Sequence, residues 1–224
     1  GFTFYGGNQQ PTIADGSREK YYDELAGYTT AEDKGKGFNR LGVLRMDVDG
    51  LGSIFAEKLN KKPQLQAFTA YSTLSAQLDL FFSGYLNTIR KQDVYEDWVN
   101  ILYSGGDDLF VLGRWDLMLD FAENIRNDFK AFIGNITQPS ISGGLALVGG
   151  KFPIAKAAEM SGDLEKEAKK YKGDLLNKNA FSFLNETVNW ESEFKQVKDL
   201  AINIEDWLNN PDLTGFTKGL IYKF

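Results

Sequence analysis

The chain of 224 residues carries a formal net charge of −6 and contains neither cysteine nor histidine. The missing cysteines exclude disulfides, zinc-thiolate sites and thiol nucleophiles, and the missing histidines exclude a Ser-His-Asp triad and the commonest general base. Chemistry in this chain must therefore use carboxylates, lysines, hydroxyls or bound metal ions. The acidic charge also argues against this chain providing, by itself, the main binding surface for a nucleic-acid backbone.

The sequence also lacks the features of a membrane or secreted protein. It has no apolar run of about 18 or more residues, and it does not begin with the charged-then-apolar layout of a secretory signal. We therefore expect a cytoplasmic protein without membrane association.

The first half of the chain predicts a strand, a long helix and a hairpin. Residues 1–38 are rich in Gly, Pro, Asn and Asp, which indicates an irregular lead-in with a short helical turn near 21–25. The segment LGVLRMDV, residues 41–48, is typical of a buried strand, DGLGS of a break, and IFAEKL of a helix start. A long helix is expected over 65–90. The segments VNILYS and LFVLG on either side of GGDD predict a β-hairpin.

The second half predicts a helix, a strand, a helix and a last strand. Residues 115–132 and 154–171 have amphipathic helical patterns, while SISGGLALV and AFSFL favour strands. The order βα(α)ββαβ is typical of an α+β, ferredoxin-like sheet, in which the first strand lies between the hairpin and the later strand. After residue 190 the pattern is helical through 208. We therefore predict an irregular segment over 1–38, a ferredoxin-like domain over 39–188, and the start of a C-terminal helical domain over 189–224.

This topology predicts that two distant pairs of aspartates meet. The first and second strands run in the same direction, so the end of the first strand and the hairpin turn share one edge of the sheet. Asp47 and Asp49 end the first strand, and Asp107 and Asp108 lie at the turn. If such a cluster were left empty, it would raise its own pKa values and cost stability. The arrangement therefore predicts bound divalent cations.

The residue types favour a particular kind of metal. Ligands that offer only oxygen suit Mg²⁺ or Mn²⁺. Two such ions, about 3.5–4 Å apart, would activate a ribose hydroxyl and neutralise charge on a triphosphate during in-line phosphoryl transfer. We expect Asp47 and Asp107 to bridge the ions, with Asp108 next and Val48 completing the metal-binding set. Asp49 either joins them or faces the turn.

The predicted nucleotide contacts surround these carboxylates. The turn glycines permit backbone angles that other residues resist, and they let a nucleotide approach without a Cβ in the way. A helix that opens after the first strand would present free N–H groups to phosphate. The later helix is lysine-rich, and Lys178 is better placed than Lys169 or Lys172 to reach a triphosphate. The predicted set is Gly50, Leu51, Gly52, Ser53, Ser104, Gly105, Gly106 and Lys178.

Each of these motifs also has a plainer interpretation. GGDD alone is compatible with an ordinary hairpin turn, the two glycines after the first strand with a simple loop, and the lysine-rich helix with a solvated face. The DxD at the end of the preceding strand, in the order that the topology requires, favours the enzymatic interpretation of GGDD.

The same residues carry a resemblance to a known family. The segments RLGVLRMDVDGLGSIF, LDLFFSGYLN, ILYSGGDDLFVLGRWD, KFPIAKAAEMSGDLEKEAK and KNAFSF resemble the second palm domain of the large polymerase-like subunit of type III-A CRISPR effector complexes. YGGN near the start and NWESEF near the end fit the flanking segments of that family. Gly50 stands where relatives often have Asn. Palm-type diguanylate cyclases share a related hairpin, but their surrounding segments are less similar.

The resemblance implies a palm domain of the nucleotidyl cyclase and polymerase type that makes cyclic oligoadenylates. ATP would be joined 3′ to 5′ with release of pyrophosphate, at two Mg²⁺ or Mn²⁺ ions held by Asp47, Asp107 and Asp108. The implied partners are the other subunits of the complex, including a first palm domain, and crRNA and target RNA bound through the complex. The HD nuclease, the first palm and a cysteine-bearing module of the family are missing, so we expect a fragment or one part of a subunit. A catalytically silent palm scaffold and a diguanylate cyclase-like enzyme are the alternatives.

Overall fold

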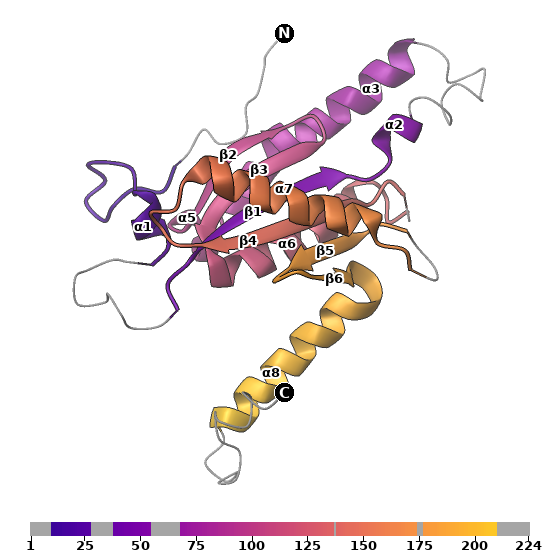
Figure 1. The fold of residues 1–224 in the computed structure, drawn as a ribbon. Helices are drawn as coiled ribbons and strands as arrows, with labels where there is room; N and C mark the ends of the chain where they lie inside the picture. The colour runs from indigo at the N-terminus through magenta and orange to yellow at the C-terminus, as the bar shows by residue number, and fades with distance from the viewer. Residues whose placement is uncertain (1–9, 28–37, 55–67, 137, 174–176, 210–224) are drawn as a thin grey trace.

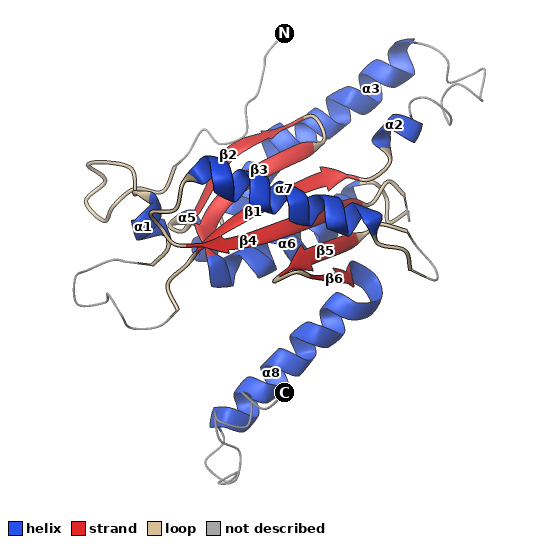
Figure 2. Ribbon diagram, viewed as in Figure 1, coloured by secondary structure: helices blue, strands red, loops and turns tan. Residues whose placement is uncertain are grey.

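A six-stranded sheet of order β2-β3-β1-β4-β5-β6 forms the centre of the molecule (Figure 1; Figure 2). The computed structural model describes residues 10–27, 38–54, 68–136, 138–173 and 177–209. Neighbouring strands are antiparallel, except that β4 and β5 are parallel. The strands are β1 (Leu41–Val48), β2 (Val99–Gly105), β3 (Asp108–Arg114), β4 (Ile141–Val148), β5 (Ala180–Phe183) and β6 (Glu186–Asn189).

Helices cover both faces of this sheet. The longer helices are α3 (Phe68–Asp79), continued by the π-helical segment η3 (Leu80–Tyr85) and α4 (Leu86–Arg90), then α6 (Trp115–Phe132), α7 (Ile154–Lys170) and α8 (Lys195–Asn209). Short elements are α1 (Tyr22–Leu25), α2 (Leu51–Ser53), α5 (Asp93–Glu96) and the π-helical η4 (Trp190–Phe194). α7 crosses one face and α6 the other, whereas α8 extends away from the sheet (Figure 1).

Two apolar cores follow from these layers. The larger core lies between the sheet and the helices α6, η3 and α4, and it includes Met46, Phe81 and Phe121. The smaller core lies on the face covered by α7 and α1, and it includes Val43 and Ala157. β1 contributes to both cores, which explains why LGVLRMDV is an almost continuous apolar run instead of an alternating one.

The predicted fold is confirmed. β1 lies between the hairpin strand β3 and the later strand β4, as in a ferredoxin-like sheet. The expected helical turn, hairpin, amphipathic helices and strands are all present within the described residues. The helix start predicted over 54–59 falls mostly outside the described residues, although a short helix already begins at Leu51. No helix in the described ranges is long and apolar enough to cross a membrane.

The structure adds three features to the prediction. β6 pairs antiparallel with β5 through a turn in which Leu184 and Asn185 have positive φ angles. The helix expected over 65–90 contains the π-helical segment η3, and α5 follows it. Trp190 and Phe194, just beyond the predicted end of the domain at residue 188, pack on Phe181 in the larger core.

Candidate functional site

The end of β1 and the turn of the β2–β3 hairpin lie side by side. Asp47 is the cross-strand partner of Asp108 in the antiparallel pair of β1 and β3. One residue further, the backbone N of Val48 donates a hydrogen bond of 3.0 Å to the carbonyl oxygen of Asp107. Two segments separated by about sixty positions in the sequence therefore meet at one edge of the sheet, where the topology predicted them.

Burial and mutual repulsion both act on the turn carboxylates. Burial raises the pKa of Asp107 above its ordinary value, and the charges of Asp47 and Asp108 raise it further. Burial also raises the pKa of Asp108; the charge of Asp47 adds to this, while a hydrogen bond with Tyr103 opposes it. The charge of Asp47 thus disfavours the charged forms of Asp107 and Asp108, and a cation placed among the three carboxylates would relieve that repulsion.

Hydrogen bonds connect the strand before the hairpin turn to the π-helical segment η3. Gly106 occupies the first central position of the turn with a φ of 64°, a conformation that favours glycine. Ser104 is buried, and its hydroxyl donates a 2.5 Å hydrogen bond to the carbonyl of Phe82 in η3. The side chain of this predicted nucleotide contact therefore fastens the strand before GGDD to the helix behind it. Ser83 of η3 adds a 3.4 Å hydrogen bond to the carbonyl of Ser104.

Asp49 does not join the other aspartates. Its side chain is buried at 4% exposure, and Oδ2 accepts hydrogen bonds from the hydroxyls of Ser140 (2.7 Å) and Ser142 (2.8 Å) and from the backbone N of Asn179 (3.1 Å). Burial raises the pKa of Asp49 above its ordinary value, although these hydrogen bonds act to lower it. The prediction that Asp49 is a fourth carboxylate of the cluster, or faces the turn, is therefore wrong. The carboxylate instead ties the end of β1 to the starts of β4 and β5.

The predicted phosphate contacts lie just beyond the end of β1 and, across β4, just before β5. Gly50 has a φ of 70° and precedes α2, where the hydroxyl and backbone N of Ser53 both donate to the Gly50 carbonyl. Leu51 packs against the larger core, so its side chain serves packing. Lys178 lies two residues before the start of β5, and its backbone N donates to the Tyr171 carbonyl at 2.9 Å. Because β4 lies between β5 and β1, Lys178 starts about 10 Å across the sheet from β1.

Lys169, which the sequence placed behind Lys178 as a phosphate contact, lies directly at the site. Lys169 of α7 forms an ion pair with Asp47, and its Nζ lies 3.3 Å from Oε1 of Glu165 one helical turn earlier. Arg45, two residues before Asp47 on the same face of β1, lies 3.7 Å from Glu165. The period-two alternation of β1 places Arg45 and Asp47 on one face. That alternation was the only sequence signal for this charged set, because the pairing with α7 depends on how the helix packs.

The donor set fits a hard divalent cation. Within the described ranges, no three acidic side chains are arranged so that they could share one metal ion. Asp47 is paired with Lys169. The carboxylates of Asp47, Asp107 and Asp108 nevertheless offer the oxygen ligands that Mg²⁺ and Mn²⁺ prefer, and the charge of Asp47 helps to raise the pKa of Asp107 and of Asp108. These three side chains, with the backbone of Val48, are the residues that would hold such ions.

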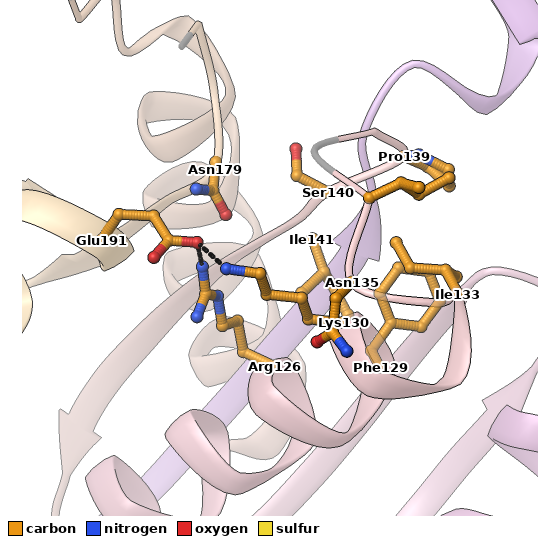
Figure 3. Close-up of a pocket in the computed structure, with 11 residues that line it drawn as sticks. Arg126, Phe129, Lys130, Ile133, Asn135, Pro139, Ser140, Ile141, Asn179 and Glu191 are labelled. Carbon is orange, nitrogen blue, oxygen red and sulfur yellow. Dashed lines mark hydrogen bonds and ion pairs between the residues drawn. The ribbon is translucent and has the colours of Figure 1, made fainter. Parts of the chain in front are cut away.

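A small cavity lies under the same edge of the sheet, on the α6 side (Figure 3). It measures about 70 Å³ and is lined by Ser140 and Asn179 of the Asp49 network and by side chains of α6. Arg126 and Lys130 point from α6 towards Glu191, which pairs with both; the Lys130 contact measures 2.6 Å (Figure 3). The cavity is too small for a nucleotide. Its lining residues Ser140 and Asn179 also bind Asp49, so the region belongs to the packing of the edge.

Comparison with known proteins identifies the domain. The profile of the family described as Cas10/Cmr2, second palm domain, matches residues 40–182. The chain belongs to this family. The match covers β1, the GGDD hairpin and most of β5, so the carboxylate edge described above lies within the Cas10/Cmr2 second palm.

Curated relatives and solved structures agree with this assignment. A relative in Enterococcus italicus is 34% identical over 203 residues, which are 89% of this chain and 24% of the relative. A relative in Methanocaldococcus jannaschii is 31% identical over 197 residues, 81% of this chain and 24% of the relative. Both are named CRISPR system single-strand-specific deoxyribonuclease Cas10/Csm1 of subtype III-A. The chain thus spans about a quarter of the length of these relatives.

The palm fold is shared with solved Csm1 chains. Crystal structures of a Csm1–Csm4 cassette in complex with pppApA and with cA4 each match with a TM-score of 0.73. Each match covers 98% of this chain and 32% of the solved chain, at 22% and 23% sequence identity. At this identity the likeness shows the α+β palm fold and no more.

Proposed function

We propose that this second palm handles ATP in a metal-dependent nucleotidyltransferase that makes cyclic oligoadenylates. The observation that carries the proposal is the register of Asp47 opposite Asp108. Beside it, the backbone N of Val48 donates to the Asp107 carbonyl, and the charge of Asp47 helps to raise the pKa of Asp107 and of Asp108. A partly buried carboxylate edge of this kind, next to a glycine turn that leaves room for a ligand, is suited to phosphoryl transfer.

The ligands of the solved neighbours support this choice of substrate. Csm1–Csm4 cassettes have been crystallised with AMPPNP, with one ATP, with pppApA, with cA3 and with cA4. These compounds form a series from a mononucleotide through a linear dinucleotide to a ring. We infer that the present chain takes adenosine nucleotides at the corresponding edge.

The proposed reaction joins ATP molecules 3′ to 5′. The ribose 3′ oxygen of one ATP loses its proton and forms a bond to the α-phosphorus of another, and the bond from that phosphorus to the pyrophosphate leaving group breaks. Repetition of this step lengthens the chain. The terminal 3′ oxygen then loses its proton and attacks the α-phosphorus at the chain's own 5′ end, the bond to the last pyrophosphate breaks, and the ring closes. Bound Mg²⁺ or Mn²⁺ would lower the pKa of the attacking hydroxyl and neutralise charge on the triphosphate.

The chain's own residues have distinct tasks in this scheme. The carboxylates of Asp47, Asp107 and Asp108 hold the cations, and Gly105 and Gly106 give the nucleotide close access to the turn. The backbone of residues 50–53, beyond the end of β1, and the side chain of Lys178, before β5, receive the phosphates.

We propose that the protein acts within a larger assembly. The solved neighbours include a Csm1–Csm4 cassette and a Csm1–Csm4 subcomplex of the type III-A CRISPR-Csm interference complex. The present chain spans about a quarter of its curated relatives. We infer that it works with a Csm4-like subunit and a first palm domain, and that crRNA and target RNA act on it through the complex.

A labelled-ATP assay tests the proposal. The protein in its complex, with Mn²⁺ and target RNA, should convert ATP into cyclic oligoadenylate and pyrophosphate, resolved by chromatography. Asp107→Ala combined with Asp108→Ala should abolish product. Asp163→Ala combined with Glu167→Ala is the matched control, because it also removes two negative charges but from the exposed side of α7.

The alternatives predict different results in the same assay. A silent scaffold would bind ATP without forming product, and a diguanylate cyclase-like enzyme would consume GTP faster than ATP. Product formation that persists in the Asp107 and Asp108 double variant would overturn the proposed site.

A further inference from the structure

Four charged side chains form a continuous chain on the α7 face of the sheet. Arg45 and Asp47 lie on β1, and Glu165 and Lys169 lie one helical turn apart on α7. The ammonium of Lys169 contacts Asp47 and lies 3.3 Å from Glu165, while Arg45 contacts the other carboxylate oxygen of Glu165 at 3.7 Å. Lys169 therefore stands between two carboxylates, one of which is a proposed metal ligand.

Packing holds this lysine in place. Gly144 of β4 has no Cβ, which lets the α7 backbone lie directly on the strand: a Cβ there would be 2.3 Å from the backbone N of Glu165. Gly162 of α7 leaves room for the guanidinium of Arg45 in the same way. The side chains of Lys169 and Asp47 are each 25% exposed, and that of Glu165 is 11% exposed. The pair between α7 and β1 is thus fixed by the fold and partly shielded from water.

A divalent cation and the Lys169 ammonium cannot both sit on the same carboxylate oxygen without strong repulsion. Glu165 offers the lysine a second acceptor within reach of its present position. Glu165 is also largely buried, so it needs a positive neighbour whether or not metal is present.

We propose that Lys169 is a resident counter-cation of Asp47 that competes with the divalent metal and transfers to Glu165 when the metal binds. This inference rests on the proposed function, because it takes Asp47 as a metal ligand. Lys169 and Glu165 are positioning residues in this scheme: they compensate Asp47 in the metal-free protein and set the metal affinity of the edge. Removal of the lysine should therefore tighten metal binding, which is the opposite of what general damage to the site would do.

Metal binding provides the test. The affinity for Mn²⁺ is measured by electron paramagnetic resonance of the free ion, in the absence of nucleotide, for the unmodified protein and for Lys169→Met. We expect the variant to bind Mn²⁺ about tenfold more tightly, because a like charge a few Å from the ion has been removed at a partly shielded site. Lys166→Met is the matched control. It removes one positive charge from the same helix, where the lysine pairs with the exposed Asp163.

Further variants separate the possible outcomes. Lys169→Gln should reproduce the gain, which guards against misfolding of the methionine variant, and Glu165→Gln should weaken Mn²⁺ binding by leaving Asp47 as the sole acceptor for Lys169. If binding depends on Asp47 but both Lys169 variants bind no more tightly than Lys166→Met, the cation exchange is refuted while the metal site stands. If binding is unchanged in Asp47→Asn, the metal site of the proposed function fails, and the exchange fails with it.

Discussion

Gly144→Ala probes the packing that brings α7 to the carboxylate edge. A Cβ at this position would lie 2.3 Å from the backbone N of Glu165 and 2.6 Å from the backbone C of Leu164, whereas ordinary contact begins at 3.4 Å. Backbone atoms cannot rotate out of the way as the end of a long side chain can. The helix or the strand must therefore shift by about 1 Å, and such overpacking typically costs about 1–3 kcal/mol, occasionally more.

Urea unfolding followed by circular dichroism measures this cost. We expect the free energy of unfolding of Gly144→Ala to fall by at least about 1 kcal/mol. Gly149→Ala is the matched control, because nothing lies within 4 Å of the Cβ that it would add and its backbone has no positive φ. If the two variants unfold at the same urea concentration with the same slope, the close approach of α7 to β4 is wrong, and the placement of Lys169 loses its support.

Substitutions at three further positions test, by the same method, the contacts that support the edge and the core. Asp49→Ala leaves the hydroxyls of Ser140 and Ser142 and a backbone N–H without their acceptor, so we expect the free energy of unfolding to fall by about 3 kcal/mol or more. Asp49→Asn keeps an acceptor and should lose less than half of that free energy. Equal losses in the two variants would contradict the hydrogen-bond network around Asp49. Phe81→Ala empties a fully buried site and should cost about 3–5 kcal/mol, and a loss below about 1 kcal/mol would show that the site is not buried as described. Trp190→Phe removes the indole donor to a buried carbonyl, and the expected loss is about 1–3 kcal/mol, against no loss if η4 is detached from the core.

The carboxylate edge could be predicted because it depends on topology alone. The direction of the strands brings Asp47 to the hairpin turn whatever the details of packing, and the register confirms the meeting with Asp108. The role of Asp49 could not be predicted in this way. That role is set by the direction of the Asp49 side chain. Its Oδ2 accepts hydrogen bonds from Ser140, Ser142 and Asn179, which follow Asp49 by 91, 93 and 130 positions in the sequence.

Other features escaped prediction for similar physical reasons. β6 has four residues and a weak alternation, so its pairing with β5 and not its composition defines it as a strand. Lys169 was one lysine among several on an amphipathic helix, and its contact with Asp47 depends on the close packing at Gly144. The π-helical segment η3 interrupts an otherwise regular helical pattern and was not visible in the spacing of apolar residues.

The anomalous scattering of Mn²⁺, in crystals of the protein grown with a non-hydrolysable ATP analogue, shows directly whether the carboxylate edge binds metal. We expect anomalous peaks about 2.1 Å from carboxylate oxygens of Asp47 and Asp107, with the triphosphate against the GGDD turn and Lys169 turned to Glu165. Peaks confined to other parts of the surface, with Lys169 still paired to Asp47 beside a bound nucleotide, would contradict this expectation.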